Sequence, residues 1–156
     1  KNNWMEIQKI KTKTMISKHQ MMHHFKMEKS VQIAKSVLAK MFKIDVIHFD
    51  KHVSRSANIN EARRFLIYYL IKELDVKYLH IKHHVPALTN HATAIHHFKK
   101  MEQLMDVEWI TRQRYDEFRR KMDTEGHSHL LKDYTDAIQE MQLIKARLKS
   151  LKDMIE

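Results

Sequence analysis

The sequence predicts an all-α protein, and three observations point to this fold class. Its 156 residues include one Gly and one Pro, which leaves few positions for the sharp turns of a β-rich chain. Lys, Glu, Leu, Ile, Met and Gln fill much of the sequence instead, and these residues lose little rotamer freedom in a helix. Apolar residues also recur at spacings of three and four, which is the periodicity of a helix face.

Charge and Cys content narrow the classes of function. The net charge is +10, and the excess of Lys and Arg lies entirely in residues 1–105. Such an unbalanced segment favours a polyanion as partner, because basic groups displace the counterions of a phosphate backbone. The absence of Cys excludes disulfides, thiol catalysis and Cys-based zinc sites. No apolar run is long enough to span a bilayer, so we expect a cytoplasmic protein without a membrane partner.

The N-terminal part predicts a basic arm followed by a helix. Residues 1–30 form the arm and the start of the first helix, whose apolar pattern covers residues 21–42. A short second helix begins at Asp45, and Ile44, Ile47 and Phe49 are expected to be buried. The next stretch, residues 50–60, is polar and poorly periodic and predicts a loop.

Residues 31–105 predict a helical domain around one central helix. Asn60 or the residue before it is expected to cap this helix, which covers residues 61–74. Its apolar residues occupy more than one face, and this pattern is typical of a helix at the centre of a bundle.

A second pair of helices follows within the same domain. A short helix over residues 77–84 ends before Pro86, because Pro cannot continue a helix. Thr89 or Asn90 is expected to cap the next helix. Two short helices joined by a tight turn are the geometry of a helix-turn-helix motif.

Residues 106–156 predict a helical hairpin or a coiled coil. The Gly lies within residues 123–128, which are expected to form a turn between two helices. Over residues 130–155 the apolar positions alternate in spacing between four and three, which is the a/d pattern of a coiled coil. A helix folding back on residues 101–122 and a second copy of the chain would both use this face, and the two alternatives stay open here. The residues expected to serve self-association are Met141, Ile144, Leu148, Leu151 and Ile155.

The second helix of the motif, LTNHATAIHHFKKME, resembles the signature of domain IV of the bacterial replication initiator DnaA, its C-terminal DNA-binding domain. That family's pattern reads roughly G-R-D-H-T-T-V-I-H-A-x-R-K-I, and the matching positions here are His91, Thr93, Ile95, His96 and Lys100. Upstream, ARRFLIYYLIKEL resembles the family's arginine-led helix, and VLAKMFKIDVIHFDKHVSRS resembles its first two helices and basic loop. The resemblance covers about residues 31–105 and implies a Trp-repressor/DnaA domain IV-like helix-turn-helix bundle.

The resemblance implies double-stranded DNA as the partner, with the second helix of the motif in the major groove. The residues implied for base readout are Asn90, His91 and Thr93. Those implied for the DNA backbone or minor groove are Lys51, Arg55, Arg63, Arg64, Thr89, Lys99 and Lys100. Taken alone, Asn90 is more often a plain helix cap, and His96 is expected to face the core.

The sequence departs from the family pattern in ways that change the expected chemistry. Asn90 and Ala92 stand where the family has Asp and Thr, so a charge and a hydroxyl are missing. The preferred DNA site should differ, because Asn pairs with adenine whereas Asp accepts from cytosine. The basic loop has fewer Arg than usual, and Pro86 replaces an apolar residue. A chain with one Gly has no Gly-rich phosphate loop, so we expect no nucleotide and no ATP-driven unwinding.

Site-specific binding of double-stranded DNA in replication or transcription control is therefore the expected function. No nucleophile–base–acid set is recognisable, so we expect neither catalysis nor a cofactor. Adjacent His pairs such as His83 and His84 point to different helix faces, which speaks against a metal site. A stand-alone domain of this kind suits a bacterial phage, plasmid or other mobile element. The alternative is a structural or adaptor protein of a larger assembly, for example a phage particle, that reuses the helix-turn-helix fold as a scaffold.

Overall fold

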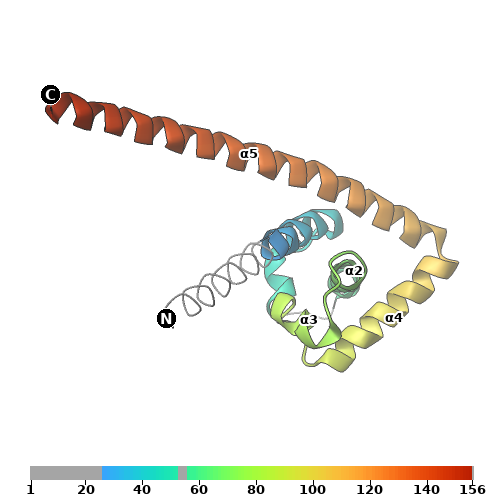
Figure 1. Cartoon of the computed structure of the whole chain (residues 1–156). Helices are drawn as coiled ribbons and strands as arrows, with labels where there is room; N and C mark the ends of the chain where they lie inside the picture. Colours follow the sequence, from blue (N-terminus) through green and yellow to red (C-terminus); the bar gives the residue numbers. More distant parts are fainter. Residues whose placement is uncertain (1–25, 53–55, 156) are drawn as a thin grey trace, which may run out of the picture. The chain divides into compact units, whose positions relative to one another are not determined.

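The structure is a computed structural model that describes residues 26–52 and 56–155, and its regular elements there are all helical (Figure 1). This confirms the predicted fold class. The elements are a helix over residues 26–42, the 3-10 helix η1 (Val46–Phe49), α2 (Ala57–Lys72), α3 (Tyr78–His84), α4 (His91–Val107) and α5 (Trp109–Ile155). The chain divides into two compact units, one ending at Phe118 and one beginning at Arg119.

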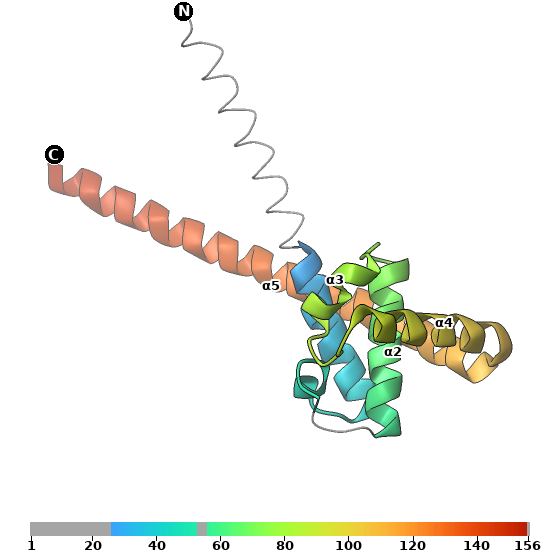
Figure 2. The ribbon, with the colours of Figure 1, turned by 90° about the horizontal axis from the view of Figure 1, so that it is seen from below.

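Helix α2 lies at the centre of the first unit, as its pattern predicts. It is seen end-on in Figure 1 and lengthwise in Figure 2, with helix 26–42, α3 and α4 around it. Its buried apolar residues are Ile59, Ala62, Phe65, Leu66, Ile67 and Leu70.

The start of α2 differs from the prediction, because Ser56 rather than Asn60 is its N-cap. The Ser56 hydroxyl accepts a hydrogen bond from the Ile59 amide at 3.4 Å. The residues between Ser56 and Asn60 include no helix breaker, and one of them, Ile59, is already buried. The apolar face therefore begins one turn before the position that the sequence indicates.

Aromatic rings tie three helices of this unit together. Phe65 of α2 contacts Phe42 of helix 26–42 with ring centroids 5.2 Å apart, and Tyr115 of α5 at 5.9 Å. One turn later, Tyr69 of α2 contacts Phe118 of α5 at 5.4 Å. Such pairs add about 1 kcal/mol each to the burial of the rings. The first three turns of α5 therefore belong to the same core as α2.

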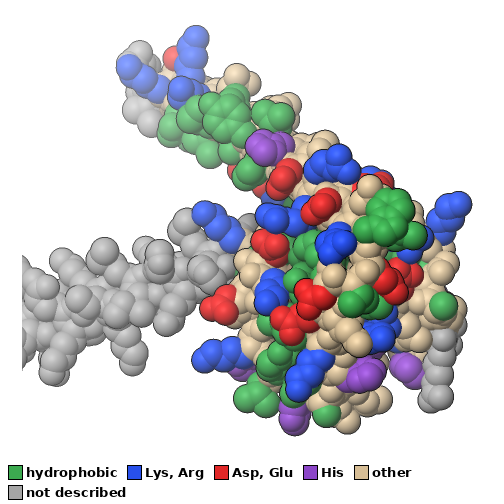
Figure 3. Space-filling view, turned by 90° about the vertical axis from the view of Figure 1, so that its right-hand side faces the viewer, with side chains coloured by type: hydrophobic (Ala, Val, Ile, Leu, Met, Phe, Trp, Pro, Cys, Tyr) green, Lys and Arg blue, Asp and Glu red, His purple; other side chains and the backbone are tan. Residues whose placement is uncertain are grey.

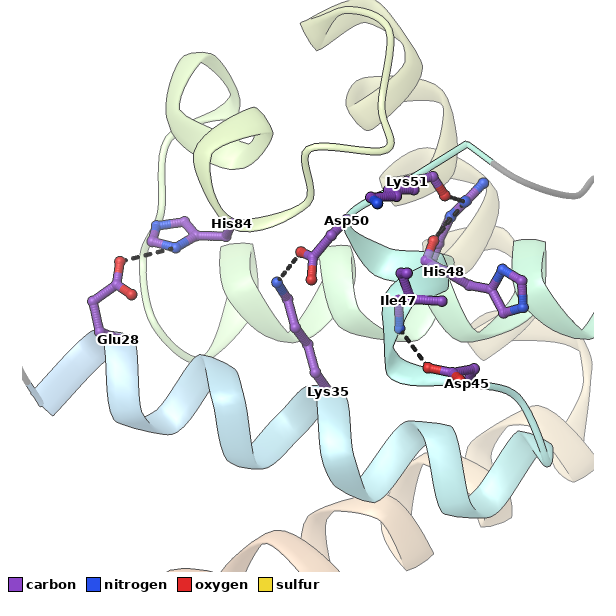
Figure 4. Close-up of polar contacts among 9 residues, drawn as sticks. Glu28, Lys35, Asp45, Ile47, His48, Asp50, Lys51 and His84 are labelled. Carbon is purple, nitrogen blue, oxygen red and sulfur yellow. Dashed lines mark hydrogen bonds and ion pairs between the residues drawn. The ribbon is translucent and has the colours of Figure 1, made fainter.

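An ion pair and a Glu–His contact attach helix 26–42 to the rest of the unit (Figure 4). Lys35, which is only 4 % exposed, donates from its Nζ to Asp50 Oδ1 at 2.7 Å. Glu28 Oε1 lies 3.9 Å from Nδ1 of the buried His84 in α3. At the start of η1, Asp45 accepts a hydrogen bond from the Ile47 amide at 2.9 Å. Phe49 is fully buried, as predicted, and Ile44 is half-buried, but the expectation for Ile47 is wrong because it is 42 % exposed.

The chain changes direction at Glu108, between α4 and α5. Glu108 has an extended backbone, and its carboxylate accepts from the Thr111 hydroxyl at 2.8 Å. The Arg112 guanidinium donates to the carbonyls of Met105 and Asp106, at 3.2 and 3.1 Å, which satisfies two acceptors at the end of α4. These contacts end one helix and begin the next without Gly or Pro.

The predicted turn over residues 123–128 is wrong. Helix α5 runs without interruption through this stretch, and Gly126 has no positive φ. Gly costs a helix only about 1 kcal/mol relative to Ala, so a single Gly does not break one. The chain therefore forms no hairpin here, and Tyr115 and Phe118 are buried against α2 instead.

The second unit exposes the apolar a/d residues of α5. Six of them that the structure describes, between Leu130 and Leu151, range from 49 % to 68 % exposed. The four that were expected to serve self-association are Met141, Ile144, Leu148 and Leu151. The side chain of the fifth, Ile155, lies outside the described residues.

Candidate nucleic-acid interface

The start of α4 is held by a small polar network. Asn90 is its N-cap, as expected, and Asn90 Oδ1 accepts from the Thr93 amide at 3.0 Å and from the Thr93 hydroxyl at 3.1 Å. The hydroxyls of Thr89 and Thr93 lie 3.4 Å apart. Lys82 of α3 donates to the Thr89 carbonyl at 3.4 Å, so α3 also supports this end of α4.

Apolar packing fixes which sides of α3 and α4 face solvent. Ile81 and Val85 are fully buried, and on α4 the residues Ala94, Phe98 and Met101 form the buried side. The Phe98 ring contacts Tyr78 of α3 at 5.8 Å and Tyr68 of α2 at 5.5 Å. The opposite side of α4 is therefore left to solvent.

We call the exposed residues between Lys77 and Lys100 the α3–α4 surface. They are Lys77, Leu79, His80, Lys82, His83, Pro86, Thr89, Asn90, His91, Ala92, His96, Lys99 and Lys100. Between Asp75 and Glu102 the sequence holds no acidic residue. Glu102 itself pairs with Lys72 at 3.0 Å. The middle of this segment, around Lys82 and the first turn of α4, therefore carries no carboxylate of its own.

Away from the α3–α4 surface, acidic and basic side chains are mixed. On the face drawn in Figure 3, Asp and Glu side chains lie among Lys and Arg over the middle, whereas His side chains gather along the lower edge. That edge is at the height of α3 and the start of α4 in Figure 1. The absence of acids is a local property of the α3–α4 surface rather than a property of the whole molecule.

The three residues predicted for base readout lie together at the start of α4, but they differ in whether their polar atoms are free to contact DNA. The Oδ1 of Asn90 is occupied in the cap, so a bidentate contact to adenine would compete with it. Thr93 is half-buried, and its hydroxyl belongs to the same network. His91 is exposed in the first turn. His91 is therefore the most accessible of the three.

The expectation that His96 faces the core is wrong, because His97 takes that place. His97 is half-buried, and its Nδ1 is buried without a hydrogen-bond partner among the described residues. Burial, and then the neighbouring charges of Arg64, His96 and Arg63, lower the pKa of His97 to about 4. His96 is exposed on the side of α4 that also carries Ala92 and Lys99. A helical wheel through Ala94, Phe98 and Met101 would have identified His96 as a surface residue.

Arg63 is a structural residue, which corrects the expectation of a DNA contact. It is only 2 % exposed, and burial lowers its pKa. Its Nε donates to the His48 carbonyl at 2.9 Å and its Nη2 to the Lys51 carbonyl at 3.1 Å. The guanidinium thus holds the end of η1 and the residues after it against α2, and it is buried away from the surface.

The other residues predicted to contact the DNA backbone or minor groove lie in several separate parts of the structure. Arg64 is half-buried, and its Nε has no hydrogen-bond partner in the described part of the chain. It lies close enough to His97 for its charge to lower the pKa of that ring. Lys51 is exposed beyond η1, while Arg55 lies outside the described residues. Thr89, Lys99 and Lys100 are exposed on the α3–α4 surface.

Comparison with models of known protein families and with curated proteins finds no match for this chain. Among the described residues, no group of three or more His, Asp or Glu side chains is arranged to hold a metal ion. In the same part of the chain, no helix is long and apolar enough to cross a membrane.

Proposed function

We propose that this chain binds double-stranded DNA through the α3–α4 surface, as a helix-turn-helix module with α4 in the major groove. One observation carries the proposal: a surface with exposed Lys and His and without acids surrounds the exposed first turn of a capped helix. An α-helix fits the width of the major groove, and Lys side chains along its flanks reach phosphates.

Within this proposal the residues have separate roles. His91 and His96 lie on the exposed side of α4 and contact base edges. Lys82, Lys99 and Lys100 bind phosphates, and the first-turn amides of α4 favour an anion at the same end. Asn90 acts first as the cap that orients this turn.

The phosphate role is tested by the salt dependence of binding to random duplex DNA. We expect the double variant Lys99→Ala/Lys100→Ala to reduce the slope of log affinity against log salt by about 2, because each phosphate contact contributes about 0.9. The matched control is Lys132→Ala/Lys149→Ala, which removes two exposed lysines of α5. An equal loss in the control would mean that the charge of the whole chain, not this surface, binds DNA. No binding of the native chain at low salt would refute the proposal and leave an assembly scaffold as the alternative.

Sequence preference is tested by selection from a randomised DNA pool. We expect one enriched motif for the native chain, and a changed or lost motif for His91→Ala and His96→Ala. Asn90→Asp is the informative partner variant, since Asp caps a helix as well as Asn does but accepts hydrogen bonds from cytosine. A motif that is unchanged in Asn90→Asp would restrict Asn90 to its capping role.

A further inference from the structure

The apolar stripe of α5 is a self-complementary surface, and this inference does not rest on DNA binding. Leu130, Tyr134, Met141, Ile144, Leu148 and Leu151 are exposed along one stripe of a continuous helix. Exposed apolar stripes at alternating spacings of three and four are buried in coiled coils. Single exposed apolar residues need no explanation, but a series of this length at one period does.

From this pattern we propose that residues 130–155 of two copies of the chain pair as an antiparallel coiled coil. In heptad terms, Tyr134, Met141, Leu148 and Ile155 occupy a positions, and Leu130, Ala137, Ile144 and Leu151 occupy d positions. Antiparallel helices place an a residue of one chain beside a d residue of the other. One register then matches the whole stripe: Leu130 with Ile155, Tyr134 with Leu151, Ala137 with Leu148, and Met141 with Ile144.

Side-chain volume favours this direction over the parallel one. In a parallel pair each residue meets its own copy, so Ala137 would meet Ala137 and leave a void, while Tyr134 would crowd Tyr134. In the antiparallel register Ala137 meets Leu148 and Tyr134 meets Leu151. The layers then have more even volumes, which is the condition for a close-packed interface.

The flanking residues favour the same direction. Antiparallel coiled coils bring together g positions of the two chains, and here Glu140 of one chain faces Arg147 of the other, twice by symmetry. Paired e positions set an apolar residue against Lys, as Ile138 opposite Lys145 does, so the aliphatic stem of Lys packs there and no like charges meet. A parallel pair would also oppose Glu140 and Lys145, but it would set Arg147 against Lys152 at both edges. The parallel arrangement therefore has repulsion that the antiparallel one avoids.

Charge reversal distinguishes the two directions. In the antiparallel pair Arg147→Glu opposes Glu140, and we expect it to raise the dimer dissociation constant of the full chain about tenfold, from two edge pairs changed from attraction to repulsion. In a parallel pair the same variant would face Lys152 and tighten the dimer. Lys149→Glu is the matched control, because it makes the same charge change at an exposed b position. Sedimentation equilibrium over a range of concentrations gives these constants.

Disulfide trapping tests the register directly, because the chain has no Cys of its own. Ala137→Cys and Leu148→Cys chains are prepared separately, oxidised alone, and oxidised as a mixture. We expect crosslinking mainly between the two different chains of the mixture. Crosslinking of each variant with itself would overturn the antiparallel assignment, and a native chain that stays monomeric at all concentrations would overturn the dimer. DNA binding is measured separately with Lys99→Ala/Lys100→Ala, so failure of either idea leaves the other standing.

Discussion

Helices α2 and α5 both carry apolar residues at helical spacing, yet one is buried and the other exposed. In α2, Phe65 and Leu66 are fully buried, and Phe65 contacts Phe42 of helix 26–42 and Tyr115 of α5. In the second unit, Leu148 and Leu151 remain more than half exposed. The difference teaches that periodicity predicts a face to be covered but not what covers it. For α2 the partner is the same chain, and for α5 we propose a second copy.

The largest effect on stability should come from truncating a buried apolar residue of α2. Truncation of an exposed apolar residue of α5 provides the comparison. Phe65→Ala should lower the free energy of unfolding of the first unit by about 4 kcal/mol, because it removes a fully buried ring between two others. Leu148→Ala should change it by less than about 0.5 kcal/mol in dilute solution, because the side chain is exposed. Urea unfolding followed by near-UV circular dichroism of the aromatic core measures both. A comparable loss for the two variants would show that the α5 stripe is already covered within one chain.

The second largest effect is a dependence of stability on pH. It should come from the half-buried His97 and not from an exposed His. The pKa of His97 is lowered to about 4, against an ordinary value of 6.5, so the unfolded chain binds the proton more readily. Stability should therefore be independent of this group above pH 6.5 and fall by about 2 kcal/mol as the pH drops to 4, after allowance for the partial exposure of the ring.

His97→Gln should remove that loss, whereas His129→Gln, at an exposed position of α5, should retain it. Urea midpoints at about pH 7 and about pH 5 are sufficient to see the difference, since the two values lie on either side of the ordinary His pKa. An unchanged pH dependence in His97→Gln would mean that this ring titrates normally in the folded protein.

The smallest effect is a gain in stability. Gly126 lies within α5, and a Cβ added there meets nothing within 4 Å. Gly126→Ala should therefore stabilise the helix by about 1 kcal/mol, seen as higher helical ellipticity and a higher melting temperature. If residues 123–128 formed the turn that the sequence suggests, the same substitution would gain nothing or destabilise the chain.

Local chemistry made several features of the first unit predictable. The end of α3 follows from Pro86, and the start of α4 follows from the capping preference of Asn90. The central place of α2 follows from apolar residues on more than one face. Each of these signals is contained within a few neighbouring residues.

Features that depend on tertiary packing were not predictable in the same way. Arg63 and Arg64 are adjacent and chemically identical, and only the position of the His48 and Lys51 carbonyls makes the first a buried structural residue. His96 and His97 differ from this case, because the helical periodicity of Ala94, Phe98 and Met101 already places His96 on the exposed side of α4. The break at Glu108 is set by side-chain caps rather than by a helix breaker, and the Gly of α5 makes no turn.

The ion pair of Lys35 has a practical consequence. Its contact with Asp50 is 2.7 Å long, and although the Asp50 carboxylate is 44 % exposed, the Lys35 side chain is only 4 % exposed, so dissolved anions reach the ammonium poorly. Lysines of the α3–α4 surface are open to solvent, and at about 1 M salt charges there are screened within about 3 Å. A high-salt wash during purification should therefore strip adhering polyanions from the chain while leaving this internal anchor, and the fold around it, in place.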